Sequence, residues 1–588
     1  MFTSLCKMAV AAMAAGLIAL VAAVPAQRAE AATFTVDSTA DAGDEAPGDG
    51  VCLTSDGECT LRAAIQEANA LAGTDSIDLP AGGYTLTIAG ANEDAAARGD
   101  LDITDDLLIT GAGRVSTIID GGALDRVMEI LSPAVVSISS LTIQNGDVLG
   151  LGGGISNRGT LTLIDTTVAG NRASRFGGGI VNYGDLAIGG SNVTFNVAGA
   201  DSGGISNTFE GAVEIIDSRI NNNTAAVAAG GLGNDGVITA ISTVVSGNSA
   251  NAAGGIGNNG TMTIIDSTIT GNAATTDSGG IGSRIGAVIE IRSSTVSNNT
   301  AETFGGIGNG GTMTIVDSTV RFNSASVIGG GISNGGPMTI IGSTISNNSA
   351  GVAGGIVNGP QGTMTVTNST ISGNIAVNSG GALNIGAMTL INSTVSGNSG
   401  EEGGGLNNAA TLTMKSTIVA NNNVGNCTGN GEFISEGDNL EDANTCGFTA
   451  ASDLPNVDPQ LGPLADNGGP TETHALLPGS PAIDAVIDGC PPPDTDQRGV
   501  TRPQGVACDI GAFELEGGGP KRVGDVNDDR RVTSVDAALV LQFGAGLIDS
   551  LANLDSADVN GDGSVNSIDA ALILQFTAGL LDGLPAQS

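Results

Sequence analysis

Two twelve-residue stretches near the end of the chain carry oxygen-bearing residues at matching positions. The first runs from Asp525 to Asp536 and the second from Asp558 to Asp569. Positions 1, 3, 5, 7, 9 and 12 of such a loop can surround one Ca²⁺ ion with oxygens, position 7 through its backbone carbonyl. The predicted ligands are Asp525, Asn527, Asp529, Arg531, Thr533 and Asp536 in the first loop and Asp558, Asn560, Asp562, Ser564, Asn566 and Asp569 in the second.

The two loops open a duplicated unit. Residues 525–547 align with residues 558–580, and each loop precedes Ala-Ala-Leu-x-Leu-Gln-Phe, whose apolar spacing predicts a helix. Gly563 fills the sharp-turn position 6 of the second loop, whereas Arg530 fills it in the first, so we expect the first loop to bind more weakly. One acidic loop can be an ordinary turn, but two copies with the same ligand positions indicate two calcium sites.

This unit strongly resembles a type I dockerin over about Gly524 to Leu581. The resemblance implies two loop–helix halves that fold with Ca²⁺ and then bind cohesin domains through the helix faces. It also implies that loop positions 10 and 11 touch the cohesin, and that the duplication permits two binding orientations. The residues carried over are Ser534, Val535, Ser567 and Ile568, together with Gln542 and Gln575, where many dockerins have a basic residue.

Most of the remaining chain is a repeat with a period of about 25 residues. The copy at residues 254–272 holds three short segments, and the second, Thr-Met-Thr-Ile-Ile, alternates as a strand with one buried face does. Gly, Asn and Asp supply the turns. We therefore predict a mainly β fold, a right-handed parallel β-helix, followed by a small all-α calcium-binding domain. The Gly-Gly-[Ile/Leu] signature recurs at Ile155, Ile180, Ile205, Leu232, Ile256, Ile281, Ile307, Ile332, Ile356, Leu383 and Leu406, and the Leu383 copy carries one extra residue, Ala382.

The third segment of almost every copy ends in asparagine. Stacked coils would align these side chains about 4.8 Å apart in a structural ladder of amide hydrogen bonds. The pattern resembles the polymorphic outer-membrane-protein repeat, with Val or Ile in place of Phe, and this resemblance implies a fold class and no narrow function. The predicted ladder is Asn171, Asn196, Asn223, Asn248, Asn272, Asn298, Asn323, Asn348, Asn374 and Asn398.

The segments that flank the repeat predict export and capping. Residues 1–31 read as a secretory signal peptide, with a basic start, an apolar stretch and a small-x-small cleavage site. Residues 32–100 contain an amphipathic helix at 59–69, which is similar to the CSLREA segment. We expect this helix to cover the open apolar end of the β-helix, which we assign to residues 101–426. Residues 427–514 resemble the choice-of-anchor Q segment, which implies a C-terminal cap and an extracellular or surface setting.

The last two boundaries and the cysteines follow from composition. Residues 515–522 form a Gly/Pro linker before the calcium unit at 523–588. Of seven cysteines, Cys6 lies in the signal peptide. The other six permit several connectivities, of which the sequence-local pairs are the economical choice in an exported protein: Cys52–Cys59, Cys427–Cys446 and Cys490–Cys508.

Composition narrows the partners. The net charge of −41 argues against binding of nucleic acid or of anionic membranes. No stretch after the signal peptide is long and apolar enough to span a membrane. The only histidine, His474, lies inside the cap segment, so we interpret it as structural.

Two acidic groups could carry further chemistry. Asp165, Asp217, Asp266 and Asp317 stand six positions before ladder asparagines in alternate coils, where they could form an inverting carboxylate pair or a cation groove, but solvated turns are the favoured interpretation. Asp100, Asp102, Asp105 and Asp106 could bind a cation, but solvated strand ends are favoured there too.

The sequence thus supports two functional hypotheses. The first is a secreted, non-catalytic β-helix that docks by calcium onto a cohesin-bearing scaffold or cell-surface protein. The second is a polysaccharide-degrading enzyme, a lyase or a hydrolase, that the same dockerin delivers to a multi-enzyme complex.

Overall fold

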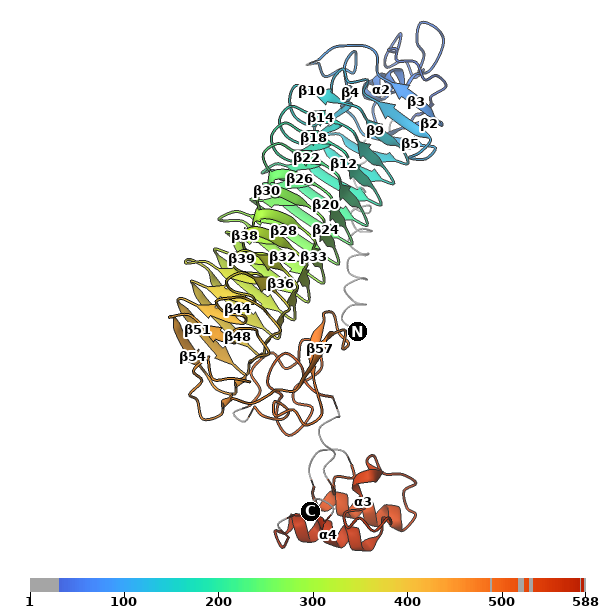
Figure 1. The fold of residues 1–588 in the computed structure, drawn as a ribbon. Helices are drawn as coiled ribbons and strands as arrows, with labels where there is room; N and C mark the ends of the chain where they lie inside the picture. The colour runs from blue at the N-terminus through green and yellow to red at the C-terminus, as the bar shows by residue number, and fades with distance from the viewer. Residues whose placement is uncertain are drawn as a thin grey trace.

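The computed structural model describes residues 31–91, 93–486, 489–516, 523–527, 532–581 and 583–585. The predicted signal peptide, most of the predicted linker, and the predicted ligands Asp529 and Arg531 lie outside these residues. Coils stack into one long body that begins at β1 (Thr33–Thr35) and α2 (Leu61–Ala70) and continues to β56 (Leu454–Pro455) (Figure 1). A separate helical unit contains α3 (Ser534–Gly544), the 3₁₀ turn η1 (Leu554–Ser556) and α4 (Ser567–Thr577).

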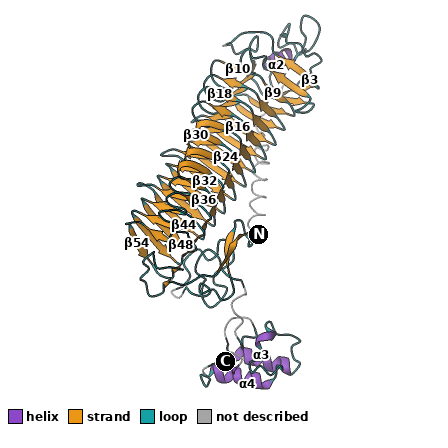
Figure 2. Ribbon diagram, in the orientation of Figure 1, coloured by secondary structure: helices purple, strands orange, loops and turns teal. Residues whose placement is uncertain are grey.

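Each central coil contributes four strands, one more than the sequence predicted. One coil contains β27 (Ile256–Asn258), β28 (Thr261–Ile265), β29 (Thr268–Thr270) and β30 (Ala273–Asp277). Strands of successive coils pair in parallel, which gives sheets of 14, 16, 16 and 10 strands that we call sheets C, A, B and D in coil order (Figure 2). The fourth strand is only two residues long in several coils, such as β14 (Arg172–Ala173), so it shows no alternation that sequence could reveal.

Inward-facing aliphatic side chains fill the coils from end to end. In β28, Met262 and Ile264 are about 1% exposed, whereas Thr261 and Thr263 face outward. The same alternation in neighbouring coils builds one continuous core. Because each coil contacts only the next ones along the stack, the core is complete only where both ends are covered.

Three side-chain ladders hold the corners between the strands. At the end of sheet B, Asn171 donates from Nδ2 to Asn196 Oδ1 at 3.0 Å, and this bond repeats along the stack. The predicted ladder is therefore present, with one correction. Asn299 replaces Asn298, because Asn298 adopts the left-handed conformation (φ 56°) of the turn.

The other two ladders were not predicted. At the end of sheet C, Asn157 donates to Asn182 at 2.7 Å, and a series of asparagines continues to Asn408 with a break at Ser283. Between sheets A and B, the backbone N–H of Thr166 donates to Ser191 Oγ at 2.9 Å, and Ser or Thr recurs there in each coil. These bonds satisfy polar groups that the coil corners would otherwise bury unpaired.

The N-terminal helix α2 packs on the first coils. Thr60 caps α2 by accepting a hydrogen bond from the backbone N–H of Ala63, and Leu61 and Ile65 pack on the first coils. Arg62 of this helix is fully buried and forms an ion pair of 2.6 Å with Asp41. Its guanidinium also donates to the backbone carbonyls of Ala96, Gly99 and Asp100 at 2.8–3.2 Å.

Two parts of the predicted C-terminal segment do different work. The Cys427–Cys446 disulfide and Phe448 join the core at its last coils. Residues 457–516 instead run back along the outer face of sheet B, where Thr471 Oγ1 donates to the carbonyl of Gly342 at 2.9 Å and Gly511 N–H to the carbonyl of Ser416 at 2.9 Å. The outward residues of β45 (Thr370–Ser372) are buried as a result, unlike those of β29.

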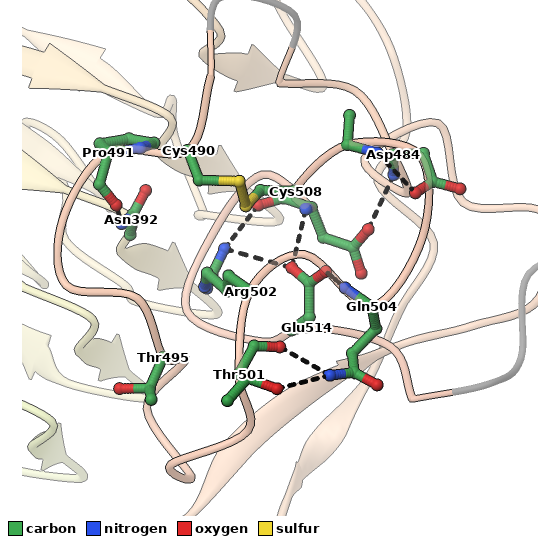
Figure 3. Close-up of a disulfide and its surroundings, with 12 residues drawn as sticks. Asn392, Asp484, Cys490, Pro491, Thr495, Thr501, Arg502, Gln504, Cys508 and Glu514 are labelled. Carbon is green, nitrogen blue, oxygen red and sulfur yellow. Dashed lines mark hydrogen bonds and ion pairs between the residues drawn. A yellow bond between two sulfur atoms is a disulfide. The ribbon is translucent and has the colours of Figure 1, made fainter.

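A network of buried charges holds this returning segment together (Figure 3). Arg502 donates to the carbonyls of Asp509 and Gly511 at 2.7 and 2.6 Å and lies 3.6 Å from Glu514. Glu514 in turn accepts the backbone N–H groups of Gln504 and Asp509. The Cys490–Cys508 disulfide lies beside it, and all three predicted disulfides are formed.

Candidate functional site

The helical unit is built twice from the same residues. Its core contains Val526 and Val559, Ala537 and Ala570, Val540 and Ile573, and Leu551 and Leu584, each pair at equivalent positions of the duplication. Helices α3 and α4 pack against one another through this core. The repeat in sequence has therefore become two equivalent halves around one small apolar centre.

The last acidic residue of each loop closes it in the same way. Asp569 accepts the backbone N–H groups of Val559 and Asn566 at 3.0 and 2.9 Å, so positions 2, 9 and 12 of the loop are joined. Asp536 accepts those of Val526 and Thr533 at 3.0 and 2.8 Å. Both carboxyl groups also form capping boxes that start α3 and α4. The loop and its helix are thus one structural element.

The second loop is described over its whole length, and its donors fit a calcium ion. Asp558 accepts the N–H groups of Asp562 and Gly563 at 3.1 and 2.7 Å, and Asp562 accepts that of Ser564 at 2.9 Å. Gly563 has φ 84°, the left-handed conformation that this sharp turn requires. The side chains at the ligand positions all offer oxygen atoms, which Ca²⁺ prefers as ligands. Each of these oxygens keeps a lone pair beyond the one that accepts a backbone hydrogen bond.

The first loop shares the position-12 contacts of the second. Asp525 is buried whereas its equivalent Asp558 is half-buried, and Asn553 Nδ2 donates to the carbonyl of Asp525 at 3.0 Å. Since Asp529, Arg530 and Arg531 lie outside the described residues, the weaker binding expected of this loop stays a prediction.

The predicted partner-binding residues are exposed in matched pairs. Val535 and Ile568, at loop position 11, are 55% and 56% exposed. Ser534, Ser567, Gln542 and Gln575 are also exposed. Sequence reasoning missed Leu541 and Leu574, which are 45% and 43% exposed on the same helices. The sequence did contain a signal for this. Ala537 and Val540 lie on the buried face of the helix, and the spacing places Val535 and Leu541 on other faces, where apolar residues are exposed.

The comparisons with known proteins agree with this geometry. Residues 523–576 match the family described as Dockerin type I domain, so the helical unit is a type I dockerin domain. Such domains bind calcium and imply a cohesin partner, and the proteins that carry them are extracellular or lie at the cell surface. A search of curated proteins gave no match for this chain.

Two solved structures are similar to the solenoid. One is the Azotobacter vinelandii mannuronan C-5 epimerase AlgE6 A-module, with 15% identity over 69% of this chain and 99% of that chain and a TM-score of 0.34. The other is pectate lyase Pel9A, with 13% identity over 83% of this chain and 98% of that chain and a TM-score of 0.27. The parallel pairing of strands in successive coils itself defines the solenoid.

The aspartates of the alternate coils occupy turns. Asp165, Asp217, Asp266 and Asp317 all have φ between 47° and 50°, at the corner between sheets A and B. In the coil whose ladder residue is Asn299, Ser293 occupies this corner with φ 46°. Aspartate adopts this conformation more readily than most residues, so the turn interpretation accounts for their recurrence.

The acidic group near the first coils is split by the fold. Asp100 and Asp102 are buried, contrary to the prediction of solvated strand ends, and their carboxylates lie within 4.8 Å of one another and of that of Glu129. Arg126 Nη1 lies 3.0 Å from Asp100 and 2.5 Å from Glu129. Burial raises the pKa of Asp100 to about 6 and that of Asp102 to about 8, the latter with help from the charge of Asp100. Arginine already neutralises part of this cluster.

His474 is buried in the returning segment and makes two hydrogen bonds there. It lies on β58 (Thr473–Leu476), where Nδ1 is 2.8 Å from the carbonyl of Gly462 and Nε2 is 2.9 Å from Ser372 Oγ. Because a carbonyl only accepts, Nδ1 donates to Gly462, and in the neutral ring that burial favours Nε2 accepts from the Ser372 hydroxyl. Burial lowers its pKa, and the bond to Gly462 offsets only part of that effect.

We expect this histidine to make the returning segment acid-sensitive. A histidine whose pKa is lower in the folded than in the unfolded chain destabilises the fold as the pH falls from about 6.5 through the folded pKa. Asp509 acts in the opposite sense, because burial raises its pKa to about 7.

His474→Asn isolates the effect of the histidine. The variant should lose about 1–3 kcal/mol at pH 7 from its buried hydrogen bonds, and less at pH 5. Hydrogen exchange of residues 457–516 at both pH values measures this. An equal loss at both would contradict the assignment.

Proposed function

We propose that the protein is an exported β-solenoid held on a cohesin-bearing partner by its calcium-loaded dockerin. The observation that carries this proposal is the pair of equivalent loop–helix halves, each with oxygen ligands closed by a position-12 carboxylate. Calcium would be held by the twelve predicted loop residues, and its charge would draw the loop oxygens together and so fix the direction of each helix.

The docking face belongs to the same two helices. We infer that Val535 and Leu541 on α3, and Ile568 and Leu574 on α4, are alternative apolar anchors, with Ser534, Ser567, Gln542 and Gln575 beside them. The pairs Val535 and Ile568, and Leu541 and Leu574, are each exposed to the same extent in the two halves. Exposed apolar side chains grouped in this way mark a surface that a partner buries. Their symmetry supports two binding orientations on one cohesin.

Export is supported by the covalent structure. Three disulfides join the sequence-local pairs, which is typical of proteins that fold outside the cytosol. The described residues contain no helix that is long and apolar enough to cross a membrane. The signal peptide at residues 1–31 remains part of this proposal.

The scaffold role is preferred to catalysis at the coil corners. The aspartates considered for a carboxylate pair have a sufficient structural reason to be there, and the long ladders use asparagine, serine and threonine for hydrogen bonds between coils. The solenoid would therefore present a surface, and the dockerin would decide where that surface is held.

Substitution of the two leucines tests the docking face. We expect Leu541→Glu or Leu574→Glu alone to lower the affinity for a type I cohesin by less than about tenfold, because the other half can still dock. The double variant should lose about 100-fold or more. Biolayer interferometry against a set of type I cohesins measures this, with the exposed Ser550→Glu as the charge control. Unchanged binding of the double variant would refute the proposed face.

A further inference from the structure

A cavity of about 900 Å³ lies on the outer face of sheet C, away from the dockerin and from the turn aspartates. It extends over seven coils, from the strand β19 (Ile205–Asn207) to the strand β43 (Ile356–Asn358). At about 4.8 Å per coil, this makes the hollow roughly 29 Å long and runs it across the strands. Its shape suits an extended chain better than a compact ligand.

Four glycines, one from each of four successive coils, form the middle of the bottom of this hollow. Gly233, Gly257, Gly282 and Gly308 occupy the outward-facing position of their strands. A Cβ on Gly257 would lie 3.0 Å from Ala229 Cβ, and one on Gly282 would lie 3.2 Å from Ala253 Cβ. We call these strand glycines the floor of the hollow, and the residues before each strand, such as Ala229 and Ala253, its wall. The floor is low because the methyl groups of the wall occupy the space that a floor side chain would need.

The coil that precedes the hollow has the opposite arrangement. Val181 fills the floor position of its coil, and the wall residues beside it are Gly152 and Gly177. A Cβ on Gly152 would lie 2.6 Å from Val181 Cγ1. Before the hollow, the floor position carries a side chain and the wall positions are glycine. In the middle of the hollow, the floor position is glycine and the wall positions carry side chains.

Both walls depart from the repeat at this place. Sheet D lengthens to four or five residues in β26 (Ser249–Ala252), β30, β34 (Thr300–Thr303) and β38 (Ser324–Ile328). On the opposite side, the turn after β31 (Ile281–Ser283) is lengthened and carries Arg284 and Ile285, the latter 89% exposed. These departures from a regular repeat enclose one and the same hollow.

The polar groups in the cavity are incompletely paired within the protein. Asp201 Oδ1 and Ser283 Oγ are buried and have no hydrogen-bond partner among the described residues. Ser283 stands where the sheet C ladder has an asparagine in the neighbouring coils. Burial raises the pKa of Asp201, and the charge of Asp235 raises it further. The hydrogen bond from the Ala228 N–H and the positive charge of Arg284 lower this pKa in part.

The lining combines acceptors with aromatic rings. Asp201, Asp235 and Asp277 contribute carboxylates, which accept hydrogen bonds from hydroxyl groups. Phe176 and Phe304 contribute aromatic rings, whose faces can attract polarised C–H groups. Three carboxylates against Arg284 make the cavity acidic, within a chain of net charge −41. This electrostatic field disfavours a polyanionic ligand.

An extended peptide fits less well than a sugar chain. A peptide gains most of its affinity by pairing with the free edge of a sheet. In the middle of sheet C, both sides of every strand already pair with neighbouring coils. We propose that this hollow binds a neutral polysaccharide, laid along the solenoid with its hydroxyls on the carboxylates and its ring faces on Phe176 and Phe304.

Affinity electrophoresis of the full chain tests the proposal. The probes are galactomannan, xyloglucan, arabinoxylan and mixed-linkage β-glucan, with polygalacturonate and alginate as acidic polymers. We expect retardation by at least one neutral polymer and none by the acidic ones. No retardation by any neutral polymer, or retardation by the acidic ones alone, would overturn the proposal.

A filled floor provides the decisive variant. Ala229→Gly/Ala253→Gly/Gly257→Val copies the arrangement around Val181, and both alanines have φ above 50°, which glycine adopts readily. The fold should survive, as circular dichroism would show, while binding falls at least tenfold. Asp201→Asn should also weaken binding, whereas Asp217→Asn, at an exposed turn on another corner, should not. Unchanged binding by the folded triple variant would refute the site.

Discussion

Replacement of Asp525 and Asp558 by alanine is expected to weaken calcium binding by the dockerin strongly and to unfold α3 and α4. Each residue is position 1 of its loop, and Asp558 also holds the N–H groups of Asp562 and Gly563. The small core around Val540 and Ile573 has few residues to stabilise it alone. Because ligand binding and folding are coupled, the affinity for calcium should fall by about 100-fold or more.

Calorimetry of the full chain with Ca²⁺ measures this, together with hydrogen exchange of residues 534–577. The wild type should show two sites, and Asp558→Ala alone should leave only the weaker one. Asp549→Ala, an exposed aspartate of the same unit, is the matched control. Two undiminished sites in the double variant would mean that the loops are not the calcium ligands.

Replacement of Arg62 by methionine is expected to cause the largest loss of stability in the solenoid. The variant leaves the Asp41 carboxylate without its ion pair and removes the donor from the carbonyls of Ala96, Gly99 and Asp100. Breaking one partner of a buried pair typically costs about 3–5 kcal/mol. Because coils interact mainly with their neighbours, the first coils should fray while those beyond β12 (Thr160–Ile164) stay protected.

Hydrogen exchange resolved along the chain shows where protection is lost. Arg158→Met is the control, because its pair with Glu129 is half exposed and should contribute no more than about 1 kcal/mol. Burial would raise the pKa of Asp41, but the hydrogen bonds from Arg62, Thr87 and Ile88 outweigh it and lower the pKa. The contribution of the pair is therefore present above about pH 4 and lost as the pH falls through the folded pKa. Equal effects of Arg62→Met and Arg158→Met would contradict this account.

Local sequence signals carried much of the fold. The recurring Gly-Gly-Ile and the alternation in Thr261–Ile265 were enough to predict parallel coils, because both features repeat in every copy. The two-residue strands of sheet D have no pattern of their own and were missed. Asn298 and Asn299 could not be distinguished by spacing, since a turn of either length keeps an asparagine near the ladder.

Long-range placement was beyond the sequence. The segment containing His474 and Arg502 was expected at the end of the stack, and its course along sheet B depends on contacts with Gly342 and Thr344 more than 100 residues away. The calcium ligands could be read directly because they lie within twelve residues. The hollow over Gly257 could not, because it needs the wall residue Ala229 from the preceding coil.

One measurement tests the central claim most directly. The full chain and a form truncated after residue 516 are passed over immobilised type I cohesins, with Ca²⁺ and then with a chelator. Our account predicts capture of the full chain by at least one cohesin in calcium, its release by the chelator, and no capture of the truncated form. Capture that survives chelation, capture of the truncated chain, or no capture by any cohesin in the set would contradict it.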